Sequence, residues 1–184
     1  ENFQKLQTSI QKAQEIDEND LECNRILCEI NKLFEDFEKS EYYGKKAFET
    51  NPNDPRVVCA YGELKVLTGR AEEGTELLIK AYELDPVGQG ASNGDKRLGD
   101  VMLGAYVKGD YNQCLEYDKK VGKKQPIAWA AKIASLSALN QTQDREVELS
   151  KFETAYPDIV LSEEIDKLHF QDTSVKQTMK ELVT

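Results

Sequence analysis

Apolar side chains recur every three or four residues along most of the chain, in blocks that short polar turns separate. Ile26, Ile30 and Leu33 show this spacing in one block, and Leu98 and Met102 show it in another. The spacing is that of one face of an α-helix, so the expected fold class is all-α. Helices are predicted over residues 1–17 and near 21–34, 37–50, 55–68, 71–84, 95–108, 111–122, 127–139 and 143–156, with two short helices after 157.

Part of this pattern occurs twice in the chain. AFETNPND at Ala47–Asp54 matches AYELDPVG at Ala81–Gly88, and the paired alanines and prolines lie 34 residues apart. Glycines stand at 62, 69 and 74, where a helix, a turn and a second helix are expected. The spacing resembles the tetratricopeptide repeat, a helix–turn–helix unit. That resemblance implies a right-handed α-α superhelical solenoid of helix hairpins with a C-terminal helical cap.

The same register divides the chain into parts of a single repeat domain, residues 1–184. Residues 1–17 read as the second half of a repeat, which suggests a piece of a larger protein. Three repeats are expected at 21–54, 55–88 and 95–126, a divergent repeat at 127–156, and the cap at 157–184. Apolar residues of the cap are expected to cover the open end of the stack: Leu161, Ile165, Leu168, Phe170, Val175, Met179 and Leu182.

A few residues mark boundaries and close contacts. Asp54 before Pro55 is a strong helix start, and Gly69 suits a turn with positive φ. Gly74 is expected where the two helices of one repeat approach closely. In the cap, Ser162 is predicted to begin one helix and Asp172 the next.

Charge limits the partners. The 34 acidic and 24 basic residues give a net charge of −10. An acidic surface repels phosphate backbones and anionic lipids, so nucleic acid is not expected as a partner. No apolar run approaches the ~20 residues that span a bilayer, so membrane insertion is not expected either. The compartment stays open between the cytoplasm and, for a parent protein with a membrane helix, the periplasm.

The sequence offers little catalytic chemistry. The sole histidine, His169, has no recognisable nucleophile partner, and the glycine-rich loop Gly88–Gly94 lacks the Lys-Ser/Thr of a nucleotide loop. The four cysteines form no CxxC pair. An enzyme, a cofactor and a metal site are therefore not predicted. Free thiols are expected, with Cys28 and Cys114 placed by packing, and Trp129 is expected in the core.

The C-terminal part carries a second resemblance. PIAWAAKIASLSALNQTQDREVELSKFETAYPD at Pro126–Asp158, KLHFQD at Lys167–Asp172 and a final amphipathic helix resemble the C-terminal repeat region of bacterial class III adenylate/guanylate cyclases. Winged-helix regulators with a repeat-containing sensor end in a similar way. The likeness covers roughly Leu77 to Thr184. It implies a regulatory interaction module of a larger signalling protein, with any cyclase activity in another part.

The family resemblance also places a binding groove on the first helices of the repeats. The candidate groove residues are Arg25, Glu29, Lys32, Arg56, Cys59, Glu63, Lys96, Leu103 and Tyr106. A protein or peptide is the expected partner. A chaperone-type carboxylate clamp is not expected, because Glu29 and Glu63 stand where that clamp needs Asn. The alternatives are an architectural or oligomerisation segment, including a homodimer, or ordinary surface charges.

Overall fold

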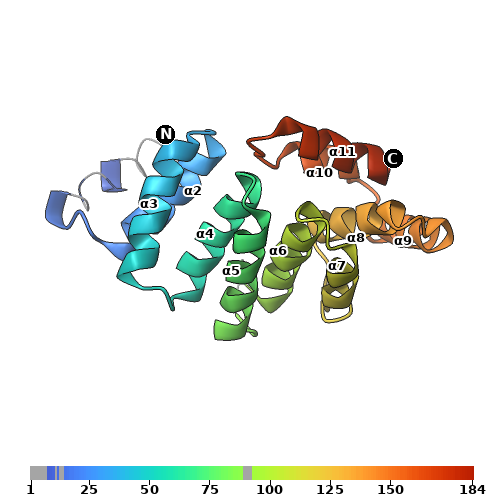
Figure 1. The fold of residues 1–184 in the computed structure, drawn as a ribbon, viewed down its shortest axis with the longest axis horizontal. Helices are drawn as coiled ribbons and strands as arrows, with labels where there is room; N and C mark the ends of the chain where they lie inside the picture. Colours follow the sequence, from blue (N-terminus) through green and yellow to red (C-terminus); the bar gives the residue numbers. More distant parts are fainter. Residues whose placement is uncertain (1–7, 11, 13–14, 89–92) are drawn as a thin grey trace.

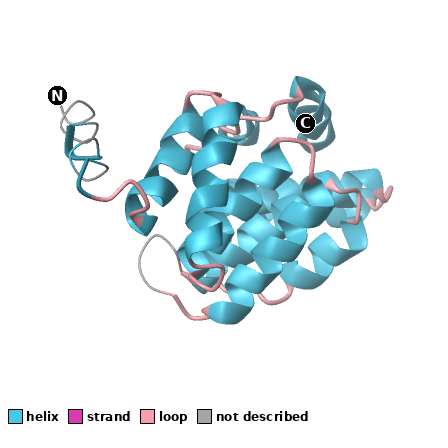
Figure 2. Ribbon diagram, turned by 60° about the vertical axis from the view of Figure 1, so that its left-hand side comes forward, coloured by secondary structure: helices cyan, strands magenta, loops and turns pink. Residues whose placement is uncertain are grey.

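The computed structural model describes residues 8–10, 12, 15–88 and 93–184. Helices joined by turns and loops make up this part of the chain, and it contains no strand (Figures 1 and 2). The predicted all-α class is therefore confirmed. The helix predicted over 1–17 lies largely outside the described residues, and so do positions 89–92 of the glycine-rich loop. None of the described helices is long and apolar enough to cross a membrane.

The helices follow the predicted order closely. They are α2 (Leu21–Leu33), α3 (Phe37–Thr50), α4 (Pro55–Leu67), α5 (Ala71–Leu84), α6 (Gly94–Val107), α7 (Tyr111–Asp118), α8 (Pro126–Ala138), α9 (Thr142–Ala155), α10 (Leu161–Asp166) and α11 (Thr173–Val183). Most predicted boundaries agree to within a residue.

Two boundaries were wrong. Helix α7 was predicted to reach residue 122 but ends at Asp118. The backbone N–H groups of Gly122 and Lys123 donate to the Asp95 carboxylate at 2.7 and 2.8 Å, which holds this segment in a loop. Helix α10 begins at Leu161 with Val160 as its N-cap, so Ser162 lies inside the helix and does not cap it.

The other predicted helix signals are present. Asp54 caps α4 by accepting from the Arg56 N–H at 2.9 Å, and Pro55 occupies the first turn. Asp172 caps α11 in the same way. Gly69 has a φ of 82°, a conformation that glycine adopts without steric cost. Sequence signals of this kind act locally, which is why they could be interpreted without knowing the fold.

Helices α4 and α5 approach closely at two glycines. A Cβ added to Gly74 would lie 2.7 Å from the carbonyl oxygen of Gly62 and 2.7 Å from the backbone nitrogen of Val66. No side chain fits at that distance, so the close approach predicted at Gly74 is confirmed. The contact fixes the position of α4, which carries part of the candidate site.

Each helix from α2 to α9 packs on the next along the chain, and Figure 1 shows them succeeding one another along the long axis. Alternate helices also touch: α2 contacts α4, α4 contacts α6, and α6 contacts α8. Side chains from α2, α4, α6 and α8 can therefore meet on a common surface.

The largest core cluster joins α6, α8 and the C-terminal helices. Met102, Ile133 and Met179 are fully buried in it, and Trp129 is only 8% exposed, as expected of a core residue. The four cysteines are free, and Cys28 and Cys114 are buried. The burial of Cys28 and Cys114 agrees with the packing role predicted for them.

The C-terminal helices return over the preceding ones. Helices α10 and α11 pack on α8. The sequence had predicted that their apolar residues cover the open end of a repeat stack. The loop between them, residues 167–172, reaches further back. The Gln171 N–H donates to the carbonyl of Leu67 at 2.9 Å, and His169 Nδ1 lies 3.1 Å from Glu35 Oε1 in the turn after α2.

Helices α7, α8 and α9 share a group of charges that we call the α8 ion cluster: Asp118, Lys124, Lys132, Glu148 and Lys151. The Lys132 ammonium lies 2.7 Å from both Asp118 and Glu148, with its side chain 14% exposed. Burial alone would lower the pKa of Lys132, but these two carboxylates raise it. The ammoniums of Lys124 and Lys132 also lie 5.1 and 5.8 Å from the Trp129 ring.

Candidate functional site

The structure brings most of the predicted groove residues together. A cavity of about 260 Å³ is lined by six of them: Arg25, Glu29, Arg56, Cys59, Glu63 and Lys96. A larger cavity of about 570 Å³ shares Glu63 and Lys96 with the first and adds Leu103. We call these the smaller cavity and the larger cavity. Seven of the nine predicted groove residues therefore line these two cavities, and Lys32 and Tyr106 line neither.

A continuous set of charges lies between the two cavities, and we call it the α4 ion cluster: Glu29, Lys32, Glu63, Lys96 and Asp100. The Lys32 ammonium lies 2.8 Å from Glu29 and 2.6 Å from Glu63. Lys96 lies 2.9 Å from the other oxygen of Glu63 and 2.7 Å from Asp100. Three carboxylates thus face two ammonium groups, which leaves one negative charge in excess.

The repeat spacing explains how this cluster assembles. Glu29 and Glu63 lie 34 residues apart, so they occupy equivalent positions on α2 and α4, two helices in contact. Lys32 follows Glu29 by three residues and Asp100 follows Lys96 by four, the spacings at which side chains of one helix meet. The sequence thus sets pairs within each helix, and the contacts between helices join the pairs through Glu63.

The electrostatics of the cluster are uneven. Burial alone would raise the pKa of Glu63 and lower that of Lys32, but their mutual attraction lowers the first and raises the second. The pKa of Lys96 is likewise raised by Glu63 and Asp100, although burial alone would lower it. Asp100 differs: burial, together with repulsion from Glu63, raises its pKa to about 7. The excess negative charge is therefore felt most strongly at Asp100.

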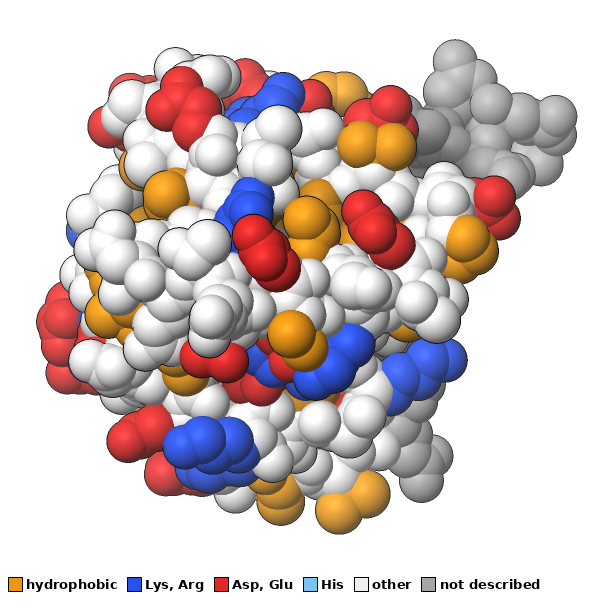
Figure 3. Space-filling view, turned by 90° about the vertical axis from the view of Figure 1, so that its right-hand side faces the viewer, with side chains coloured by type: hydrophobic (Ala, Val, Ile, Leu, Met, Phe, Trp, Pro, Cys, Tyr) orange, Lys and Arg blue, Asp and Glu red, His pale blue; other side chains and the backbone are white. Residues whose placement is uncertain are grey.

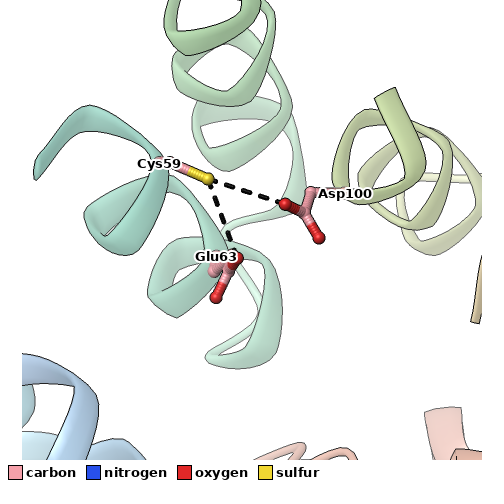
Figure 4. A group of neighbouring side chains, drawn as sticks. All are labelled: Cys59, Glu63 and Asp100. Carbon is pink, nitrogen blue, oxygen red and sulfur yellow. Dashed lines mark hydrogen bonds between the residues drawn. The ribbon is translucent and has the colours of Figure 1, made fainter. Parts of the chain in front are cut away.

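Cys59 completes the site. Figure 4 shows its thiol beside Glu63, also from α4, and Asp100 from α6; the Sγ lies 3.7 and 3.6 Å from their carboxylate oxygens. One ligand atom from each of the three lies within 4.8 Å of the others, a separation compatible with a metal ion. However, the Lys96 ammonium already pairs with both carboxylates, and burial and these carboxylates raise the thiol pKa well above its usual value. A metal would have to displace the lysine and deprotonate the thiol, so we describe the group as part of the ion cluster.

Arg25 and Arg56 stand at the outer side of the smaller cavity, where acidic neighbours hold both. Arg25 lies 2.7 Å from Glu22, and Arg56 lies 3.3 Å from the same Glu22 and 2.9 Å from Asp54. An incoming anion would therefore compete with carboxylates that are already paired.

Tyr106 was misplaced by the sequence interpretation. It lines neither of the two cavities and is 6% exposed, with its ring centroid 5.9 Å from that of Tyr111. The start of α7 covers this end of α6, which turns the ring into the core.

Other site residues were missed. Asp100 had a signal in its spacing from Lys96, four residues earlier, which places both on one helix face. The larger cavity is also lined by Val66, Leu67 and Ile127. Their positions in the sequence pattern predicted only ordinary core residues.

The larger cavity is closed partly by residues from a remote segment. Its walls come from the C-terminal half of α4, from α6 and from the start of α8, while Glu164 of α10 and the following Leu168 form another side. The return of the C-terminal helices therefore builds one wall of the site. Nothing in the local sequence around Glu164 signals this.

The outer surface at the α7–α9 end has a different character. On the face in Figure 3, acidic, basic and apolar side chains are interspersed among the described residues. A partner bound there would meet no single dominant charge.

No protein-family model matches the chain, and no curated protein matches it.

Proposed function

We propose that the chain is a protein-interaction module of the tetratricopeptide type, a right-handed solenoid that binds a segment of a partner protein on the surface shared by α2, α4, α6 and α8. The observation that carries this proposal is the pair of adjoining cavities on these helices, with the α4 ion cluster between them. Such a surface joins the apolar walls of the larger cavity to fixed charges, the combination that gives a peptide site both affinity and specificity.

The repeat geometry supports the proposal. Helices α2 and α4 begin 34 residues apart at Leu21 and Pro55, and so do α3 and α5 at Phe37 and Ala71. Repeats of this kind stack their first helices into an extended recognition surface. The resemblance of the C-terminal part to cyclase-associated and regulator-associated repeats supports a role for the module in a bacterial signalling protein.

An experiment on the intact chain tests the surface. Random 12-residue peptides displayed on phage are selected on the wild type, and the enriched peptides are measured by fluorescence anisotropy. Reversing the charge of Arg25 and Arg56 together should weaken binding by roughly tenfold or more. Glu76→Lys, an exposed site on α5 away from both cavities, should change binding by less than about twofold.

Salt dependence and thermal melting complete the experiment. Peptide binding should weaken as salt rises, because the charges of the site are partly exposed. Thermal melting checks that each variant folds. Equal losses for the two variants would point to an architectural segment that associates elsewhere, and the absence of any enriched peptide would overturn the proposal.

A further inference from the structure

The larger cavity has a clear chemical division. Val66 and Leu67 of α4, Leu103 of α6, Ile127 of α8 and Leu168 give it apolar walls. Its volume of about 570 Å³ lies within the roughly 300–1,000 Å³ of typical ligand pockets. The space therefore suits an aliphatic side chain and the backbone beside it.

The charged side of the same cavity is acidic. Glu63, Asp100 and Glu164 line it with a single ammonium, that of Lys96. Lys96 is shared between Glu63 and Asp100, and among the described residues Glu164 pairs with the exposed Lys167. A ligand that placed only apolar atoms here would desolvate these carboxylates without compensation, and an anionic ligand would be repelled.

We propose that the larger cavity binds a partner segment in which an aliphatic side chain adjoins a lysine or arginine. The aliphatic side chain enters the apolar part, and the cation lies at Asp100 with Glu164 on the opposite side. This inference rests on the proposed function, since it names the chemistry of the partner for the same surface.

The state of Asp100 supports the assignment. Burial and the neighbouring Glu63 raise its pKa to about 7, which is the behaviour of a carboxylate short of positive charge. The charged or titratable groups facing it are Lys96 on its own helix, Cys59 and Glu63 on α4, and, through Glu63, Lys32 on α2. A bound cation would supply the missing charge and favour the ionised carboxylate.

Focused peptide libraries test this chemistry. Three 12-residue libraries are random except for a central Leu followed by Lys or Arg in the first, by Gln in the second and by Asp or Glu in the third. The wild type should enrich the basic library at least roughly tenfold over the acidic one, because hydrogen bonds to charged groups are the strong ones. Asp100→Asn should remove most of that preference, whereas Glu76→Gln, a matched loss of charge at an exposed site, should not.

The pH dependence gives an independent reading. Binding of an enriched basic peptide should strengthen roughly tenfold from pH 6 to pH 8, the ratio of ionised fractions around a pKa of about 7. In Asp100→Asn the dependence should be nearly flat. A flat profile in the wild type would overturn the role given to Asp100.

A cavity-filling variant separates this inference from the proposed function. Ile127→Trp occupies the apolar part from a half-buried position, and thermal melting verifies its fold. If all three libraries yield binders equally and Ile127→Trp abolishes them, the surface binds peptides but the basic preference is wrong. If no library yields binders that depend on this cavity or on Arg25 and Arg56, the proposed function fails with it.

Discussion

Two of the partly buried ion clusters in the described part of the molecule look alike in chemistry and differ in setting. The α8 ion cluster has two carboxylates and three ammonium groups between α7, α8 and α9, packed under Trp129. The α4 ion cluster has three carboxylates and two ammonium groups, and it borders both cavities.

The difference teaches that buried charge is not by itself a functional signal. In the α8 ion cluster each carboxylate has two ammonium neighbours, and the central Lys132 is only 14% exposed. Such a cluster holds helices in register. In the α4 ion cluster the carboxylates outnumber the ammonium groups, the Lys96 side chain is 40% exposed, and the uncompensated carboxylate lies next to open space. Incomplete compensation beside a cavity is what suggests a missing partner.

Equivalent lysine substitutions give the largest contrast. Lys132→Met should reduce the free energy of unfolding by about 3 kcal/mol, because it leaves Asp118 and Glu148 close together with less compensation. Lys96→Met should cost under about 1 kcal/mol, since its ammonium is solvent-screened and Asp100 can take up a proton. Urea denaturation of both variants makes the comparison, and similar losses would contradict it.

The helix that carries Cys59 and Glu63 can be displaced without touching the α8 ion cluster. Gly74→Ala places a Cβ against the backbone of α4 and should cost roughly 1–3 kcal/mol. Cys59 should then react faster with a thiol reagent, while the fluorescence of Trp129 stays unchanged. Glu76→Ala, on α5 like Gly74, is the control. A Gly74→Ala protein with the wild-type melting temperature would refute the close packing.

Asp100 of the α4 ion cluster and Glu148 of the α8 ion cluster should respond to pH in opposite directions. The raised pKa of Asp100 means that the folded chain holds a proton that the unfolded chain has lost, so stability falls as pH rises from about 5 to 8, by roughly 2–3 kcal/mol. Burial would raise the pKa of Glu148, but Lys132 and Lys151 lower it, so its contribution is present above the ordinary value of 4.5 and is lost in acid. Asp100→Asn should remove the fall between pH 5 and 8 and keep the loss in acid. Thermal melts across this range provide the measurement.

The sequence predicted those parts of the fold that depend on neighbours along the chain. Asp54 and Pro55 start α4, and Gly69 and Gly74 mark a turn and a close contact, because each acts within a few residues or within one hairpin. The equivalence of Glu29 and Glu63 followed from the repeat spacing alone.

The features that could not be predicted from the sequence depend on contacts between distant segments. The burial of Tyr106 requires knowing how the start of α7 packs on the end of α6. The contribution of Glu164 and Leu168 requires the C-terminal helices to return across α8. The pKa of Asp100 is raised by its burial and by its proximity to Glu63, and both depend on how α4 and α6 pack together.

The loop at residues 167–172 has a consequence for how the chain resists unfolding. A row of repeats touches only its neighbours, so its ends can fray independently. Here Gln171 is bonded to Leu67, and His169 meets Glu35 across a sequence separation of 134 residues. These contacts connect the segment between α10 and α11 to the end of α4 and to the turn after α2. Breaking either contact should therefore reduce the cooperativity of unfolding of the whole chain, and destabilising α2 should also destabilise α11.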